Sequence, residues 1–355
     1  MISKHIKIIV GITILILIIL VIIIYKKVKR NKKIEEVPDV KRPFLNIYTN
    51  DGRKLNVLFI TFPFTDDKSI IEYNNLKKKN INFLGMSSYQ EFPGLMTNPH
   101  DPLKDKKYSG CNYNYMTMTE GWCHCFRDPN KYIPSDFKKA LISESDFHDY
   151  NVHKPADIKI QDKEYDFIYV CLKDDDKCSY GWQAHNRNWE GALKYLEIMC
   201  SKYKLRGCLI GRINCKIPDS CHKLLDLTDF MEYSHFIKMY DKCKFIFLPN
   251  LTDASPRVMT EAMDYNLPVL VNENILGGWK YVNEQTGVFF NDGNFEKQLD
   301  VFLKNLDKYK PRDYFINNYG PINSGKRLLE FIKECIPQDK LNIDLNSIEY
   351  LKPAI

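Results

Sequence analysis

The stretch KFIFLPNLTDASPRVMTEAMDYNLPVLV, residues 244–271, decides the fold. Its apolar start, residues 244–248, predicts a buried strand, and Pro249 begins a polar loop. Residues 256–265 have the pattern of an amphipathic helix, and residues 268–271 are apolar again. A strand, a helix and a strand in this order predict two parallel strands joined by a crossover helix.

The same alternation continues on both sides of this stretch. We expect strands at residues 165–172, 208–211 and 288–290, helices at 187–203 and 234–243, and further helices towards Cys335. Such a pattern predicts a doubly wound parallel sheet, in which ligands bind beyond the carboxyl ends of the strands. This rule selects the loops after Leu172, Gly211, Leu248 and Val271.

A second, shorter α/β region precedes this one. Residues 55–62 form an apolar run between Gly52 and Pro63, and a helical stretch separates it from a second apolar run at residues 81–86. This is the pattern of a strand, a helix and a strand. Residues 87–134 are rich in Pro, Gly, Asn and Tyr and show no clear period.

The distribution of charge argues against a nucleic-acid partner. The 355 residues carry a formal net charge of +6, but residues 1–33 hold eight Lys and Arg side chains and no acidic ones. The rest of the chain therefore has a net charge of −2. Binding a polyanion requires clustered positive charge, which this composition does not provide.

The N-terminal segment predicts a membrane anchor. Residues 8–25 contain no charged side chain, and as a helix they would extend about 27 Å, enough to cross a bilayer. No small-residue cleavage site follows, which favours an uncleaved anchor over a signal peptide. Lys4 and Lys7 precede the span, and six cationic side chains follow it within residues 26–33. The positive-inside bias therefore favours a cytosolic location for the body, by which we mean the folded part of the chain after the anchor. The alternative is a lumenal body.

The eleven cysteines have irregular spacing, which fits a reducing compartment better than a disulfide framework. Residues 122–125, Trp-Cys-His-Cys, together with Cys111 resemble a metal site, but a second closely spaced pair of ligands is missing. We therefore expect buried thiols and no metal. The glycosylation sequon that begins at Asn250 falls in the loop after residues 244–248, where a glycan would obstruct the predicted site.

The loop after residues 244–248 holds the residues that predict chemistry. Ser255 is expected to cap the following helix, with Pro256 at the first helical position. The free N–H groups of that helix would then attract an anionic ligand. Asp253 and Glu261 lie eight positions apart, which could bring two carboxylates to the hydroxyls of one ligand.

This segment resembles the E-x7-E region of retaining GT-B glycosyltransferases of the large group-one class, with Asp253 at the position of the first Glu. Residues 236–249 resemble the helix and strand before the family's motif. Residues 261–270 resemble its "EAM…G.PVV" run, and residues 286–290 resemble its "TG.L" strand. The resemblance covers roughly residues 165–335.

The resemblance implies an α/β, GT-B-like fold, in which two Rossmann-like domains face a cleft and the N-terminal one is short. One transmembrane helix would precede these two domains. The chain would then divide into an anchor (1–30), a stalk (31–54), an acceptor-side domain (55–155), a nucleotide-sugar-binding domain (156–340) and a tail (341–355).

The resemblance also implies roles for single residues. Glu261 would hold the ribose hydroxyls of a nucleotide, and Asp253 would face the donor sugar, although Asp is one methylene shorter than Glu. Arg187 and Lys173 would offset the charge of the diphosphate leaving group. The remaining candidates for donor binding are Gly211, Arg212, Ser255, Pro256 and Arg257.

These expectations describe a membrane-anchored glycosyltransferase. It would move a sugar from a nucleotide-diphosphate donor to a glycan, lipid or protein acceptor, with retention and without a metal or other cofactor. One alternative is a membrane-tethered binding protein that kept the fold but lost turnover. A second is a metal-dependent GT-A transferase that uses Asp174 and Asp176. A dinucleotide-dependent oxidoreductase is a poor interpretation because no G-x-G-x-x-G sequence occurs.

Overall fold

The computed structural model describes Ile18, residues 36–103 and residues 113–355. The chain divides into two compact units, residues 1–38 and 39–355. The expected anchor at residues 8–25 lies outside the described residues except for Ile18. In the described part of the chain, no helix has both the length and the apolar character that crossing a membrane requires.

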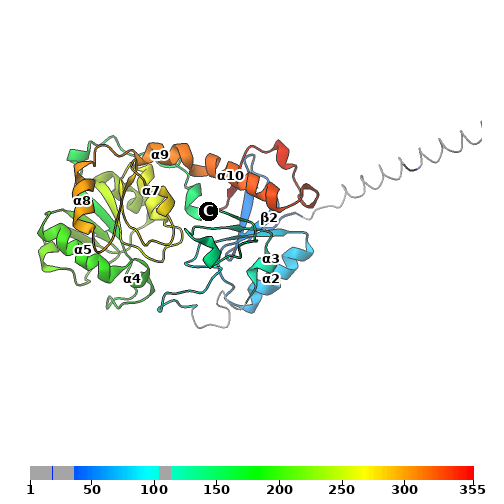
Figure 1. Cartoon of the computed structure of the whole chain (residues 1–355), viewed down its shortest axis with the longest axis horizontal. Helices are drawn as coiled ribbons and strands as arrows, with labels where there is room; N and C mark the ends of the chain where they lie inside the picture. The colour runs from blue at the N-terminus through cyan, green and yellow to red at the C-terminus, as the bar shows by residue number, and fades with distance from the viewer. Residues whose placement is uncertain (1–17, 19–35, 104–112) are drawn as a thin grey trace, which may run out of the picture. The chain divides into compact units, whose positions relative to one another are not determined.

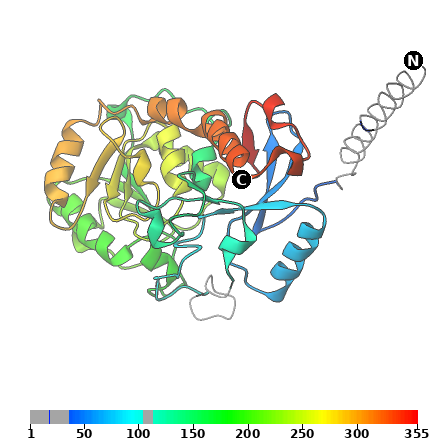
Figure 2. The same ribbon diagram turned by 45° about the vertical axis from the view of Figure 1, so that its right-hand side comes forward.

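Two six-stranded sheets, each with its own helices, make up residues 39–355 (Figures 1 and 2). We call them the first and the second lobe. The sheet of the first lobe has the order β12-β1-β2-β3-β4-β5. Its strands are β1 (Phe44–Thr49), β2 (Lys54–Ile60), β3 (Asn82–Met86), β4 (Trp122–Cys123), β5 (Lys139–Ala140) and β12 (Leu351–Pro353). Its helices are α2 (Asp67–Lys78), α3 (Tyr115–Met118) and α10 (Gly320–Cys335).

The first sheet is parallel from β2 to β5 and antiparallel at its β1 and β12 edge. On one face, side chains of β1, β2 and β3 pack against α10 and the residues that follow it, including Leu328, Ile332 and Leu345. On the other face Phe44 and Phe83 join an aromatic cluster with Phe64 and Tyr73 of α2. The first lobe therefore has its core on both faces of the sheet.

The sheet of the second lobe is parallel throughout and has the order β11-β10-β9-β6-β7-β8. Its strands are β6 (Tyr165–Val170), β7 (Gly207–Ile210), β8 (Leu225–Thr228), β9 (Cys243–Leu248), β10 (Val269–Asn272) and β11 (Gly287–Phe290). Its helices are α4 (Trp182–Asn186), α5 (Trp189–Ser201), α6 (Tyr233–Met239), α7 (Arg257–Asp264), α8 (Phe295–Lys304) and α9 (Pro311–Asn318).

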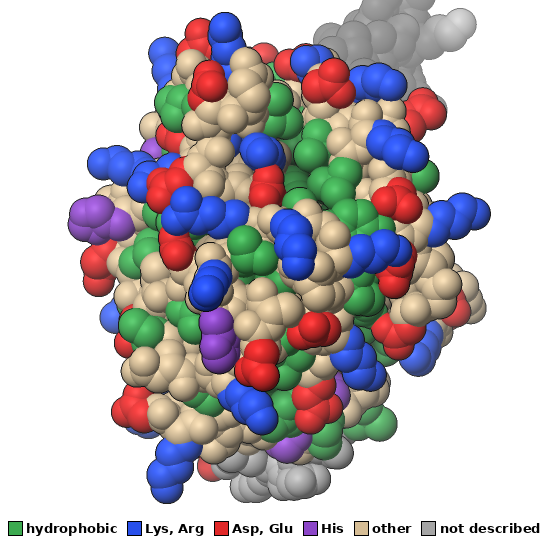
Figure 3. Space-filling model, turned by 90° about the vertical axis from the view of Figure 1, so that its left-hand side faces the viewer, with side chains coloured by type: hydrophobic (Ala, Val, Ile, Leu, Met, Phe, Trp, Pro, Cys, Tyr) green, Lys and Arg blue, Asp and Glu red, His purple; other side chains and the backbone are tan. Residues whose placement is uncertain are grey.

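Alternate residues of each central strand enter different cores, as expected for a sheet covered on both faces. Phe167 and Tyr169 of β6 pack with α5 and α8, whereas Ile168, which lies between them, packs with α6 and α7. The arrangement confirms the doubly wound parallel sheet that the sequence predicts. On the side of the molecule that carries α5 and α8, cationic and acidic side chains are interspersed (Figure 3).

The end of the chain returns to the first lobe. A break at Gly320, whose φ is +79°, separates α9 from α10, and a Cβ at this position would meet the ring of Tyr150. Beyond the break, α10 covers the sheet of the first lobe, and β12 pairs with β1. The first lobe is therefore larger than residues 55–155, because it also contains α10 and β12.

The structure differs from the sequence predictions in four places. Residues 44–49, expected in a stalk, form β1, and part of the expected tail at 341–355 forms β12. Strand β8 was not predicted, because Leu225–Thr228 is short and contains a charged residue. The helix expected at 187–203 begins only at Trp189, because Asn188 adopts a left-handed conformation with φ +53° and separates α4 from α5.

Candidate active site

A cleft of about 1290 Å³ lies between the two lobes. The second lobe contributes residues at the carboxyl ends of β6 and β7 and in the loop after β9, and the first lobe contributes the loop after β3 and the segment around His148. This is the edge at which parallel α/β sheets bind their ligands. Of the sequence candidates, the cleft is lined by Arg187, Asp253, Ser255, Arg257 and Glu261.

The loop after β9 is held by contacts with α4. The backbone N–H of Leu251 donates to the carbonyl of Asn186 at 3.1 Å, and the Thr252 hydroxyl donates to the Asn186 side-chain oxygen at 2.9 Å. A Cβ on Gly277 would lie 1.8 Å from the carbonyl oxygen of Ala254, so only glycine permits this approach. The loop is thereby fixed against both α4 and the loop after β10.

Arg187 and Asp253 form an ion pair inside the cleft. The Asp253 carboxylate also accepts a hydrogen bond of 3.1 Å from the side-chain amide of Asn250. Burial lowers the pKa of Arg187 from its ordinary value, but a guanidinium stays charged at any physiological pH. Arg187 lies at the C-terminal end of α4 rather than at the start of a long helix. Asn250, the sequon residue, is fully buried.

Glu261 lines the cleft from the second turn of α7 and is 8% exposed. Its carboxylate accepts a hydrogen bond of 3.3 Å from the Tyr240 hydroxyl. Burial raises the pKa of Glu261, while His148, Arg257 and the two tyrosines Tyr240 and Tyr233 oppose that rise. Glu261 is therefore a largely desolvated acceptor whose side chain is held by hydroxyl donors.

The start of α7 differs from the prediction. The N-cap is Pro256 and the first helical residue is Arg257, so Ser255 is not the cap. The Ser255 hydroxyl instead contacts the first lobe, where it accepts from the Ser145 N–H at 2.8 Å and donates to the Ser145 hydroxyl at 2.9 Å. Pro256 is not among the residues that line the cleft, whereas Arg257 is exposed there.

Arg212 is fully buried and is not among the residues that line the cleft. Its guanidinium donates to the Cys171 sulfur and the Leu172 carbonyl, both at 3.1 Å, and stacks on the Trp189 ring at 4.8 Å. Gly211, with φ +96°, lets this chain segment approach the Leu172 backbone. Both residues therefore support the loop after β6, which corrects the expectation that they touch a donor.

Lys173 does not lie where it could bind a diphosphate in the cleft, and the acidic run that follows it does not form a metal site. Lys173 is not part of the cleft lining and forms ion pairs with Asp176 at 3.0 Å and Asp229 at 3.5 Å. The Asp174 carboxylate accepts backbone N–H groups at the start of α4, including that of Gln183 at 2.6 Å, and pairs with Arg212 at 3.4 Å. Asp174 and Asp176 therefore have separate structural partners and do not form a metal-binding pair.

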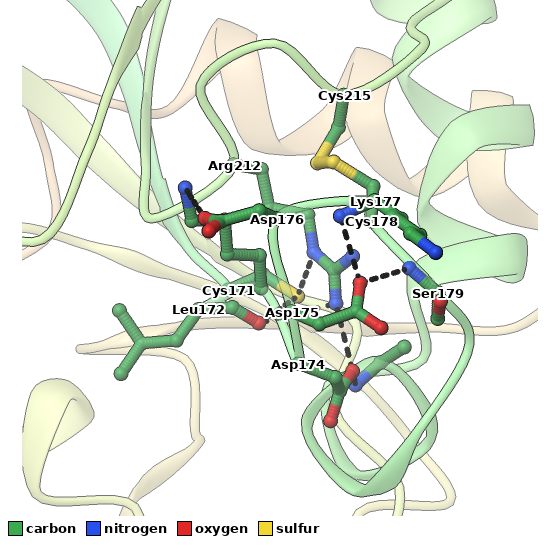
Figure 4. Close-up of a disulfide and its surroundings, with 12 residues drawn as sticks. Cys171, Leu172, Asp174, Asp175, Asp176, Lys177, Cys178, Ser179, Arg212 and Cys215 are labelled. Atoms are coloured by element: carbon green, nitrogen blue, oxygen red, sulfur yellow. Dashed lines mark hydrogen bonds and ion pairs between the residues drawn. A yellow bond between two sulfur atoms is a disulfide. The ribbon is translucent and has the colours of Figure 1, made fainter.

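Four cysteines in the second lobe form disulfides, Cys178–Cys215 and Cys200–Cys221. Figure 4 shows the first of these above Arg212, where it joins the loop after β6 to the loop after β7. The irregular spacing of the cysteines, which favoured a reducing compartment over a disulfide framework, did not predict these two bonds. Cys123 and Cys125 are buried thiols as predicted, and no group of metal-binding side chains occurs among the described residues, which do not include Cys111.

Sequence reasoning assigned no role to Tyr240 or Asn186, which hold Glu261 and the loop after β9. The structure also gives His148 a partner on another element. The His148 ring nitrogen Nε2 lies 3.0 Å from the carboxylate of Asp264 on α7. No local pattern could identify these residues, because each acts on a residue of another element.

Known structures with a similar arrangement are glycosyltransferases. TarM of S. aureus superposes with a TM-score of 0.53 at 13% identity, covering 76% of this chain and 53% of TarM. A glycosyltransferase from Rickettsia africae gives 0.51 at 15% identity, with 79% and 77% covered. Sucrose-phosphate synthase from Thermosynechococcus elongatus gives 0.51 at 8% identity, with 75% and 70% covered.

The chain has a GT-B fold. It spans about half the length of TarM. No protein-family model matches the sequence, and no curated protein matches it by sequence. At these identities the likeness concerns the fold, so the activity has to be argued from the cleft itself.

Proposed function

We propose that this protein is a glycosyltransferase that transfers a sugar from a nucleotide-diphosphate donor to an acceptor. The observation that carries the proposal is the position of Arg187, Asp253 and Glu261, which line one cleft between the lobes of a GT-B fold. The TarM structure that resembles this chain was determined with UDP bound, which supports a nucleotide donor.

In the proposed reaction, the bond between the sugar's anomeric carbon and the diphosphate breaks, and the oxygen of the acceptor hydroxyl forms a new bond to that carbon. The proton of that hydroxyl is taken up by the departing diphosphate. The diphosphate leaves with the bonding electron pair, so negative charge grows on its oxygens. The Arg187 guanidinium, with Arg257 as a second cation in the cleft, would stabilise that charge. The buried acceptor Glu261 would bind the ribose hydroxyls, and Asp253 would orient the sugar.

Retention of the anomeric configuration and independence of metal ions are part of the proposal and rest on the sequence resemblance. The geometry of Asp174 supports metal independence, because its carboxylate oxygens are engaged by Arg212 and the backbone of α4. We also propose that residues 8–25 anchor the chain in a membrane, on the basis of their apolar composition.

The proposal is tested by donor binding and turnover in the full-length chain. Thermal unfolding should shift upward with at least one of UDP-glucose, UDP-galactose, UDP-N-acetylglucosamine and GDP-mannose, because a ligand that binds only the native state stabilises it. Glu261→Gln should remove that shift and the release of nucleotide diphosphate. Binding without turnover in the wild-type chain would identify a non-catalytic binding protein instead, and loss of activity with EDTA would contradict metal independence.

A further inference from the structure

The Cys178–Cys215 disulfide belongs to a turn that leads towards α4. Cys178 lies in the loop after β6, and Cys215 lies in the loop after β7, three residues beyond Arg212. The backbone N–H of Cys215 donates to the Arg212 carbonyl at 3.1 Å, so Cys215 and Arg212 share one turn. The Arg212 guanidinium extends from this turn to Asp174, with which it pairs at 3.4 Å (Figure 4).

Asp174 connects this turn to Arg187 through the backbone of α4. Its carboxylate accepts from the N–H groups of Gly181, Gln183 and Ala184 at 3.3, 2.6 and 3.0 Å. The Gln183 carbonyl in turn accepts from the Arg187 N–H at 3.0 Å. Asp174 is therefore the acceptor that fixes the start of α4, and the position of Arg187 at the other end of this short helix depends on it.

The two disulfides differ in exposure. Cys200 and Cys221 are fully buried, whereas Cys178 is partly exposed and its two neighbours in the chain are exposed. Reduction of a disulfide begins when a thiolate reaches one of its sulfur atoms, so the accessible bond reacts first. A dithiol reductant should therefore open the Cys178–Cys215 bond before the other one.

The backbone of Cys178 favours a rearrangement once the bond is open. Its φ of +55° lies in the left-handed region, which residues other than glycine seldom adopt. The bond to Cys215 holds this conformation together with a hydrogen bond of 3.1 Å from the Cys178 N–H to the Asp175 carbonyl. Opening the bond removes one of these two constraints from the loop that carries Asp174.

We infer that the Cys178–Cys215 bond is a redox switch on the position of Arg187. In the oxidised chain the loop after β6 fixes α4 and directs Arg187 to Asp253, and in the reduced chain this support is lost. The reductant supplies two electrons and two protons, so that the S–S bond breaks, two thiols form on the chain, and the dithiol becomes a disulfide. The effect on the donor rests on the proposed function, but the effect on α4 does not.

Hydrogen exchange of the full-length chain provides the first test, and it requires no substrate. Dithiothreitol is titrated, and peptide mapping should show the Cys178–Cys215 bond opening before the other disulfide. Opening should raise the amide exchange of residues 181–187 about tenfold, because the support of α4 is weakened. The double variant Cys178→Ser with Cys215→Ser should exchange equally fast without reductant. Lys177→Ala, an exposed change in the same loop that keeps the bond, is the matched control.

Donor binding provides the second test. With a nucleotide sugar that stabilises the oxidised chain, reduction should raise the concentration for half-maximal stabilisation about ten- to a hundredfold, because Arg187 is misplaced. Re-oxidation with oxidised glutathione should restore the affinity. Arg187→Met should bind the donor equally weakly in both redox states, because the bond acts through the side chain that this change removes.

The two tests separate this inference from the proposed activity. If no nucleotide sugar binds the oxidised chain, the proposed transferase is contradicted, whereas faster exchange on reduction would still support control of α4 by the bond. The inference is overturned if residues 181–187 exchange equally fast in both redox states, if the other disulfide opens first, or if reduction leaves the donor affinity unchanged.

Discussion

The guanidinium of Arg187 and the carboxylate of Asp253 form an ion pair inside the cleft, although the two residues lie on different loops of the second lobe. Asp253 stands where the resemblance places a longer Glu, and the C-terminal end of α4 brings Arg187 to it. The cation proposed to bind the diphosphate is therefore held by the acid proposed to orient the sugar.

This pairing predicts strong coupling between the two side chains. Arg187→Met and Asp253→Asn should each lower kcat/KM by about 10²- to 10³-fold, the usual effect of removing one stabilising group. Each should also lower the melting temperature more than the double variant does, because a single change leaves one desolvated charge unpaired. Thermal unfolding and steady-state kinetics measure both effects. Arg206→Met, which breaks a surface ion pair with Asp226, is the control. Additive effects of the two single changes would contradict the coupling.

Most of the second lobe could be predicted from the sequence, because its strands are continuous apolar runs between helices of clear period. Residues 165–172 and 268–271 lie within two residues of β6 and β10. The first lobe was predicted less well. Its β1 has polar residues at Asn46 and Thr49, and its partner β12 comes from the other end of the chain. Local periodicity cannot detect such a pairing.

Site residues that lie together in one segment of the chain could be predicted from the sequence. Residues whose role depends on contacts between segments could not. Asp253 and Glu261 follow β9 in the chain and both line the cleft. Arg212 also follows a strand, but it contacts the Cys171 sulfur and the Trp189 ring and does not line the cleft. A sequence cannot show which way such a side chain turns, because that depends on packing.

The burial of Glu261 predicts a conflict between stability and activity. Its pKa is raised in the folded state, so its contribution to stability is present below its ordinary pKa and is lost as the pH rises through the raised value. Glu261→Gln should therefore raise the melting temperature at pH 7 but have little effect near pH 4, while turnover is lost. Melting curves of both forms across this range test the sign. Glu296→Gln, an exposed change on α8, is the matched control. A lower melting temperature for Glu261→Gln at pH 7 would argue against a desolvated carboxylate.

A buried ion pair between Lys280 of the second lobe and Asp146 of the first joins the two lobes, and it leads to a third prediction. Lys280 lies 2.8 Å from Asp146, and the two side chains are 6% and 0% exposed. Burial lowers the pKa of Lys280, which the Asp146 charge opposes. Asp146→Asn should destabilise the chain by about 3–5 kcal/mol, because it leaves the ammonium group buried without its counter-charge.

Urea unfolding of the Asp146→Asn variant measures this change. The double variant with Lys280→Met should recover part of the loss, since the uncompensated charge is then absent. Lys333→Met breaks a pair with Glu330 on the surface of α10 and should cost less than about 1 kcal/mol. An Asp146→Asn chain as stable as the wild type would show that the pair does not hold the lobes together.

The two disulfides predict the compartment of the body, because disulfides persist in oxidising environments and are rare in the cytosol. We expect both bonds to be formed in the chain isolated from cells after rapid alkylation, which would place residues 39–355 in an oxidising compartment, against the charge bias of residues 1–33. Peptide mapping by mass spectrometry identifies the pairs. The Cys178–Cys215 bond closes 37 residues, so reducing it should cost up to about 4 kcal/mol and loosen the loop that carries Asp174. Alkylated Cys178, Cys200, Cys215 and Cys221 would instead support the cytosolic body that the charge bias predicts.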